Sequence, residues 1–210
     1  MTSQSAAEKR DGTIRRILDA AAKSFAESGF EGARMDKIAK RAKINKAMIY
    51  YHIGDKKALY AEVLHDIIGN ATDRFKNKIN RLQTPEEKLK ALIHAMAATM
   101  DQHPPLASIM LREQASGGQN LPEMIAREFA GIVKVLTDIL EQGAGQGVFI
   151  RTTPFIIHSM ITGSVLFYKG SFPIRSRQAV FPDAVKKLGG SVSGDASKEI
   201  EKLILKAVRK

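Results

Sequence analysis

Apolar residues along this chain are spaced three or four positions apart, which is the spacing of helices rather than strands. The first such stripe contains Ile14, Ile17, Leu18, Ala21, Ala22 and Phe25. It predicts a helix from Thr13 with one buried face, ended by Gly29 at the C′ position. Two shorter helices are predicted over 35–42 and 46–53. Because small alanines stand at their contact positions, these three helices would form a compact unit.

A fourth apolar stripe is longer than this small unit needs. It begins after Asp55, which is placed to cap a helix, and it continues to about Leu82 with a bend expected at Gly69 and Asn70. We therefore expect this helix to connect the unit to the rest of the chain. The remainder shows no strand pattern, and its expected helices cover 85–103, 106–114, 120–143, 153–170 and 195–209, with one further turn at 183–188.

The predicted fold class is therefore all-α, with a three-helix domain over 1–54 and a larger helical domain over 55–210. Residues 1–10 are small and polar without a period, so we expect them to form a disordered arm. The stretch 153–170 is apolar almost all round, which predicts burial on both sides. We expect one of those sides, together with 195–209, to face a second copy of the chain. The alternative is that both helices pack inside one subunit.

The corner between the second and third predicted helices lies at 40–52. Asn45 stands at an N-cap position, where its side-chain oxygen can accept from a free backbone N–H. Ile44 before it and Ile49 within the helix are spaced for a hydrophobic staple. Three lysines and an arginine surround the turn, and two tyrosines and a histidine follow. A short capped helix with cations and hydroxyl-bearing aromatics suits a phosphate-lined groove, which is the helix-turn-helix hypothesis.

Positive charge is concentrated at the start of the chain. The net charge is +11, and the first 60 residues hold 13 Lys and Arg against 7 Asp and Glu. This balance favours a polyanionic partner for the first third of the chain. A basic surface that serves only solubility is the alternative, and charge alone does not decide between the two.

Other protein classes find little support in the composition. Without cysteine there is no disulfide and no thiolate metal site. No apolar run reaches the ~18–20 residues of a membrane span, and the first residues lack the apolar core of a signal peptide. We therefore expect a cytoplasmic protein that does not contact membranes. No metal-spaced histidine pair, phosphate loop or nucleophile motif occurs, so we predict no catalytic site, metal or cofactor.

Two rival interpretations stay open beside the helix-turn-helix hypothesis. One is an enzyme, including a zinc-type site built from His94, His103 and a carboxylate. The other is a basic protein that binds membrane surfaces through amphipathic helices. A membrane-surface protein would bind anionic vesicles and show no preference among DNA sequences.

The first 60 residues resemble the DNA-binding domain of the TetR/AcrR family of transcriptional regulators. The matching positions run from Ile17 to Leu59 and include Ala21-Ala22, Phe25, Gly29-Phe30, Met35-Asp36-Lys37-Ile38-Ala39, Ala42 to His52 and Asp55-Lys56-Lys57-Ala58-Leu59. The sequence departs from the family pattern at Lys43, where Gly is usual, and at Ala33-Arg34, where Thr or Ser caps the second helix. It also has Ile53 in place of an aromatic. The helical remainder is similar to the family's ligand-binding and dimerisation domain.

The resemblance implies that 46–52 is the recognition helix, lying in the major groove of a double-stranded DNA operator. Its first residues are then placed to meet base edges, while other side chains contact phosphates and fix the register. The expected DNA contacts are Arg34, Lys43, Asn45, Lys46, Ala47, Met48, Tyr50, Tyr51, His52 and Lys56. For Tyr50 and Tyr51, packing in the core is the alternative role.

The resemblance also implies a ligand-responsive repressor that acts as a homodimer on a palindromic operator, joined through 153–170 and 195–209. An apolar or amphipathic small-molecule effector would be enclosed by Met96, Met100, Met110, Phe129 and His158, which lie on apolar helix faces. Methionine adapts its shape to varied ligands, although ordinary core packing is the alternative for each residue. The effector is expected to favour a conformer whose recognition helices no longer match the half-site spacing.

Overall fold

The computed structural model of the protein describes residues 2–171 and 196–210, with side chains from Arg10 onward. Within these ranges every regular element is a helix, which confirms the all-α fold class. The elements are α1 (Thr2–Gly32), α2 (Met35–Ala42), α3 (Lys46–His52), α4 (Lys56–Leu64), the π-helical turn η1 (His65–Gly69), α5 (Asn70–Ile79), α6 (Pro85–Gln102), α7 (Pro105–Ala115), α8 (Glu123–Gly145), α9 (Pro154–Gly170) and α12 (Ala196–Val208). The turn expected at 183–188 and a cap at Asp195 lie outside the described residues.

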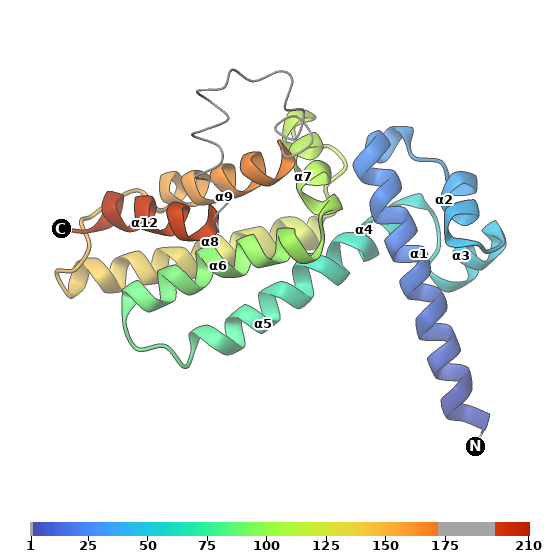
Figure 1. The fold of residues 1–210 in the computed structure, drawn as a ribbon, viewed down its shortest axis with the longest axis horizontal. Helices are drawn as coiled ribbons and strands as arrows, with labels where there is room; N and C mark the ends of the chain where they lie inside the picture. The colour runs from blue at the N-terminus through green and yellow to red at the C-terminus, as the bar shows by residue number, and fades with distance from the viewer. Residues whose placement is uncertain (1, 172–195) are drawn as a thin grey trace, which may run out of the picture.

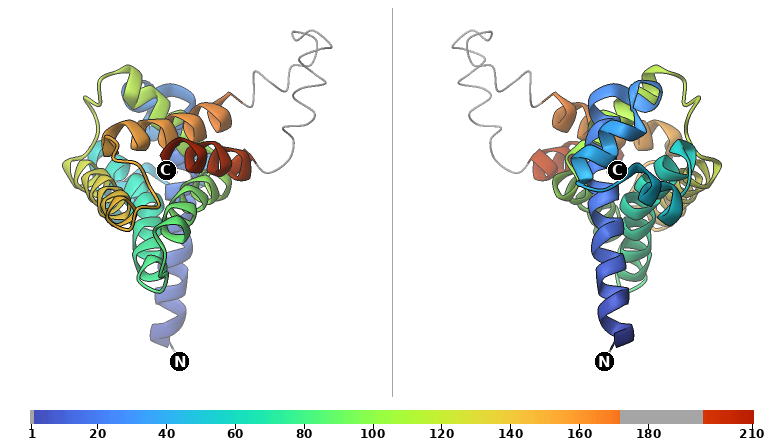
Figure 2. Two further views of the ribbon diagram at one scale, coloured as in Figure 1. Left: turned by 90° about the vertical axis from the view of Figure 1, so that its left-hand side faces the viewer. Right: turned by 90° about the vertical axis from the view of Figure 1, so that its right-hand side faces the viewer.

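The helices form two groups that are joined through α4 (Figure 1). Helices α1, α2 and α3 make the small unit at one end, and α5 to α9 with α12 make the larger bundle at the other. Figure 2 shows the N-terminal turns of α1 projecting from the rest of the molecule. This arrangement agrees with the predicted three-helix unit, connector and larger helical domain.

Two hydrophobic clusters hold the fold together. The first contains residues of the small unit, and it continues without a break into α4, α7 and α8. Its fully buried members include Ile17, Phe25, Ile38, Ile49, Leu59, Leu64, Leu106, Ile109 and Ile125. The second lies within the larger bundle and includes Leu89, Leu92, Leu136, Ile161 and Ile204. Because the first cluster crosses residue 54, the small unit is packed directly against the bundle.

The start of α1 differs from the prediction. The helix begins at Thr2 rather than at Thr13, so the expectation of a disordered arm over 1–10 is wrong for residues 2–10. The segment contains no proline and several good helix formers, so it can continue the helix that Ile17 and Phe25 anchor in the core. Gly29 has φ 70° and ψ 177°, a positive-φ backbone that favours glycine, and it interrupts the regular helix three residues before the end of α1 at Gly32.

The connector is not one uniform helix. It consists of α4, the π-helical turn η1 and α5, and the turn ends at Gly69, next to the expected bend. A Cβ at Gly69 would stand 2.6 Å from Nδ1 of His65, so a larger residue here would require the exposed His65 ring to move. The long helix α8 begins at Glu123 rather than at the predicted Asn120. Pro122 explains the difference, because a proline disfavours helical backbone in the residue before it.

Candidate functional site

The turn between α2 and α3 holds Lys43 in a left-handed backbone conformation. Lys43 adopts φ 55° and ψ 47°, the only non-glycine residue with positive φ in the described part of the chain. Its N–H donates to the carbonyl of Lys40, and the N–H of Ile44 donates to that of Ala39, both at 3.1 Å. These two bonds close α2 as a Schellman motif does. Lys43 therefore adopts the left-handed backbone for which glycine is usual at this position.

Helix α3 is fixed from its first residue. Oδ1 of Asn45 accepts a 3.0 Å hydrogen bond from the N–H of Ala47, so the predicted N-cap is confirmed. Ile49 is fully buried, and the half-buried Ile44 packs against the same cluster. By contrast, Arg34 at the start of α2 makes no side-chain cap, as its departure from the family pattern suggested.

The opposite face of α3 is open to solvent. Ala47 is exposed, and the exposed fractions of Met48, Tyr50 and Tyr51 are 39%, 49% and 81%. Core packing is therefore excluded for both tyrosines. His52 is half-buried, and its Nδ1 has no hydrogen-bond partner in the described residues. That nitrogen therefore faces the protein, while the tyrosines face outward.

Lys46 is held by an acidic neighbour on α2. Its Nζ lies 3.1 Å from Oδ1 of Asp36, and this hydrogen bond and charge raise the pKa of Lys46. The side chain of Asp36 is 76% exposed and that of Lys46 is 42% exposed. Asp36 thus orients the lysine at the start of α3, and a base contact by Lys46 has to compete with this carboxylate.

Two other cations near the turn serve the protein's own packing. Nζ of Lys56 donates to the carbonyls of Glu31 and Ala33 at 3.2 and 3.4 Å, and it lies 4.6 Å from the centroid of the Phe30 ring. It therefore joins the start of α4 to the end of α1. Arg41 binds both carboxylate oxygens of Glu27 on α1, at 2.9 and 3.0 Å. Lys43 and Arg34 stay exposed.

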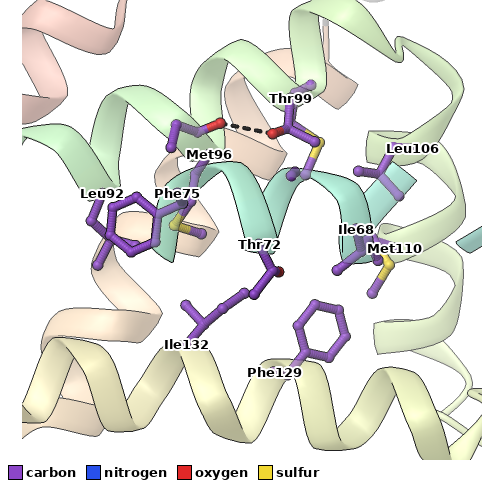
Figure 3. Close-up of a pocket in the computed structure, with 13 residues that line it drawn as sticks. Ile68, Thr72, Phe75, Leu92, Met96, Thr99, Leu106, Met110, Phe129 and Ile132 are labelled. Carbon is purple, nitrogen blue, oxygen red and sulfur yellow. Dashed lines mark hydrogen bonds between the residues drawn. The ribbon is translucent and has the colours of Figure 1, made fainter. Parts of the chain in front are cut away.

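A cavity lies between η1, α5, α6, α7 and α8 in the larger bundle (Figure 3). Its volume is about 80 Å³, several times the roughly 10–15 Å³ that one water molecule requires. Its 13 lining residues carry no charge. Four of the five residues expected to enclose an effector are among them, namely Met96, Met100, Met110 and Phe129.

His158, the fifth expected residue, does not line this cavity. It belongs to α9, is half-buried, and has its Nε2 3.3 Å from Oγ1 of Thr162. Burial lowers the pKa of His158, because the protonated ring loses solvation. The apolar stripe of α9 could not show which neighbour its histidine would face, so the sequence grouped it with four residues that line a cavity it does not reach.

The structure also separates the residues of the rival zinc-type site. His94 is bound through Nε2 to Glu201 at 2.5 Å and through Nδ1 to Ser197 at 3.2 Å, which fastens α6 to α12. No three potential metal ligands come together in residues 2–171 and 196–210. In those same ranges, no helix has the length and apolar character needed to cross a membrane.

Sequence reasoning missed the contacts that join the two parts of the fold. Tyr60 on α4 donates a 2.7 Å hydrogen bond to Oε1 of the buried Glu113 on α7. Arg112 next to it donates to the carbonyls of Ala26 and Glu27 at the end of α1. One signal was available: Arg112 and Glu113 are the only charged residues of α7, although their partners lie more than 50 residues away.

Comparison with known proteins agrees with this geometry. Residues 17–63 match the family described as bacterial regulatory proteins, tetR family, and residues 82–168 match the tetracyclin repressor-like C-terminal domain. The HTH-type transcriptional repressor NicS of Pseudomonas putida is 33% identical over 174 residues, which is 79% of each chain. The chain therefore belongs to the tetR family of bacterial regulatory proteins.

Solved structures share the fold along nearly the whole chain. The hemolysin II transcriptional regulator HlyIIR has 29% identity and a TM-score of 0.68, covering 96% of this chain and 99% of its own. FadR from Bacillus subtilis, solved in complex with stearoyl-CoA, has a TM-score of 0.68 at 21% identity and covers 91% of this chain and 97% of its own. At that identity, the second likeness concerns the fold alone.

Proposed function

We propose that this protein is a sequence-specific DNA-binding repressor that responds to a small-molecule ligand and acts as a homodimer on a palindromic operator. The observation that carries the proposal is the capped helix α3, whose outward face bears Lys46, Met48 and Tyr51 beside a basic turn. Relatives described as transcriptional repressors support the direction of regulation. Such a protein acts in the cytoplasm, where it meets DNA, and it needs no catalytic site.

The exposed residues of α3 suit different parts of the DNA surface. Lys46 can donate to guanine O6 and N7, and Ala47 and Met48 offer apolar contact to a thymine methyl. Tyr50 and Tyr51 point outward with hydroxyls that suit phosphate oxygens, and Arg34 and Lys43 add exposed cations. We assign Lys56 to the packing of α1 against α4 instead, because its amine is already bound to two carbonyls.

The homodimer would form through α9 and α12, which pack side by side (Figure 1). One face of α9 is buried in the bundle, but Phe155, Ile156, Met160 and Phe167 are 40–72% exposed. Leu203 on α12 is 57% exposed. Large apolar side chains exposed on two neighbouring helices suit an interaction surface. To read two half-sites, such a dimer would present its two α3 helices about 34–36 Å apart, one DNA turn.

The ligand would act through the cavity between α5 and α8. Met110 and Leu106 line it from α7, and α7 also binds the end of α1 through Arg112 and α4 through Glu113. A ligand that binds more tightly when α7 is displaced would therefore also move α1 and α4, and with them the recognition helix. The hypothesised response is a population shift to a conformer with mismatched half-site spacing.

Selection of bound DNA from a random pool tests this function. We expect a palindromic sequence to be enriched, with affinity that falls steeply as salt rises and is lost on scrambled sites. A reporter gene behind the selected site should be more active when the protein is absent. Equal binding to all sequences, or binding to anionic vesicles instead of DNA, would contradict the proposal.

A further inference from the structure

The cavity wall contains one hydroxyl that the protein leaves unused. Thr72 on α5 is 5% exposed, and its hydroxyl makes no hydrogen bond to any described residue. Figure 3 shows its side chain reaching from α5 toward α8, where Phe129 and Ile132 face it. A buried hydroxyl without a partner is unfavourable, and such groups commonly mark a place for a missing ligand atom or water.

The second threonine of the cavity behaves differently. Oγ1 of Thr99 on α6 donates to the carbonyl of Ala95, one turn earlier, at 2.8 Å. This bond is the dashed line in Figure 3. The Thr99 hydroxyl is therefore satisfied within its own helix, and Thr72 is the one lining side chain that offers an unused hydrogen bond.

The rest of the wall excludes charge. All lining residues other than the two threonines are apolar, and no cationic or anionic side chain is among them. An ionised group buried in such surroundings loses its hydration without gaining a partner. Three methionines, Met96, Met100 and Met110, can adapt their flexible side chains to enlarge the cavity around a guest.

We propose that the effector of this protein is an uncharged, mainly hydrocarbon molecule with one hydrogen-bonding oxygen, and that Thr72 binds that oxygen. The inference rests on the proposed ligand-responsive function and makes it specific. It rejects free carboxylates and polar sugars as occupants. It also distinguishes this chain from an acyl-coenzyme A sensor, since the head of that ligand is strongly anionic.

The probe for this proposal is 1-octanol, titrated calorimetrically into the full-length protein without DNA. Octanoate and octanoyl-coenzyme A carry a similar chain with a charged head. We expect 1-octanol to bind measurably and both charged compounds to bind at least tenfold more weakly. Absence of 1-octanol binding, or tighter binding of either charged compound, would overturn the proposed ligand class.

The matched variants are Thr72→Val and Thr99→Val, which remove one hydroxyl each with little change of shape. Thr72→Val should weaken 1-octanol binding by roughly three- to tenfold, the effect of one net hydrogen bond, while Thr99→Val leaves it unchanged. Equal effects of the two variants would refute the role of Thr72. The calorimetric assay contains no DNA, so it tests the ligand class independently of DNA binding. A failure to bind 1-octanol would therefore overturn the ligand class without affecting the result of the DNA selection.

Discussion

The phenolic hydroxyl of Tyr60 donates a 2.7 Å hydrogen bond to Oε1 of Glu113, and both side chains are buried. The bond joins α4, which leads into the recognition unit, to α7, which lines the cavity. Phe25 and Phe30 of α1 pack around the Tyr60 ring with centroids 4.7 and 5.1 Å away. The helices α1, α4 and α7 are therefore held together around the Tyr60 side chain.

Removing this hydroxyl should destabilise the fold. In Tyr60→Phe, Oε1 of Glu113 would lose its donor, while Oε2 already has no partner in the described residues. We expect the free energy of unfolding to fall by about 1–3 kcal/mol, measured by urea denaturation. The double variant Tyr60→Phe/Glu113→Met should be more stable than Tyr60→Phe, because it also removes the unpaired carboxyl. A double variant less stable than the single one would contradict this account.

The same pair predicts a dependence on alkaline pH. Burial raises the pKa of Tyr60, and the hydrogen bond to Glu113 adds to the effect. An unfolded tyrosine loses its proton near pH 10, while the folded Tyr60 keeps it. The unfolded state therefore binds fewer protons above about pH 10, and folding stability falls as pH rises. The difference in unfolding free energy between wild type and Tyr60→Phe should be constant below about pH 9 and shrink above pH 10.

Replacing Lys43 by glycine should stabilise the protein and weaken DNA binding. The left-handed backbone costs a residue with a Cβ about 1 kcal/mol, which Lys43→Gly removes. The loss of one phosphate contact should reduce the salt slope of DNA binding by about one. Lys43→Ala is the control, because it loses the same cation and retains the strain. Thermal melting and binding at several salt concentrations separate the two effects.

Lys46 and Lys56 should respond differently to truncation. Lys46→Ala is expected to relax base preference by about tenfold at one operator position, measured by competition between operator variants. Lys56→Ala should lower the melting temperature, because α4 loses its bonds to the carbonyls of Glu31 and Ala33. Lys57, an exposed neighbour on the same helix, gives the control: Lys57→Ala should leave the melting temperature unchanged. If Lys56→Ala and Lys57→Ala both lowered the melting temperature, the stabilising role of the Lys56 hydrogen bonds would be refuted.

The exposed face of α9 predicts that charge will separate the subunits. Phe155 and Phe167 are 65% and 72% exposed, so Phe155→Glu/Phe167→Glu should leave the fold of one subunit intact. We expect a dimer for the wild type and a monomer for the variant at micromolar concentration in sedimentation. Met124→Glu changes an exposed apolar residue on α8 and should remain dimeric. A monomeric wild type would contradict the proposed homodimer.

Local chemistry made much of this fold predictable. The N-caps Asn45 and Asp55 are present as the sequence suggested, and a capping box of Thr84 and Glu87 starts α6. They involve residues two or three positions apart, which a linear pattern shows. The start of α1 was misplaced, because the same pattern cannot show that a packed helix will extend into a polar segment.

The candidate sites were predictable to different degrees. The outward face of α3 followed from its apolar period and its cap. The partners of Lys46, Lys56 and Arg41 did not, because a cation gives no sign of which carboxylate or carbonyl it will meet. Thr72 was overlooked on the apolar stripe of its helix, between Ile68 and Phe75, although a polar residue in that position was itself a signal.

By itself, the sequence determined the helices, the turn at Lys43 and the recognition helix. These features depend on backbone preference and on spacing within one segment. Only the tertiary structure decided which methionines share a cavity, why Thr72 has no partner and how Tyr60 meets Glu113. These contacts join residues far apart in the chain. Their formation depends on how whole helices pack against each other, which no local pattern encodes.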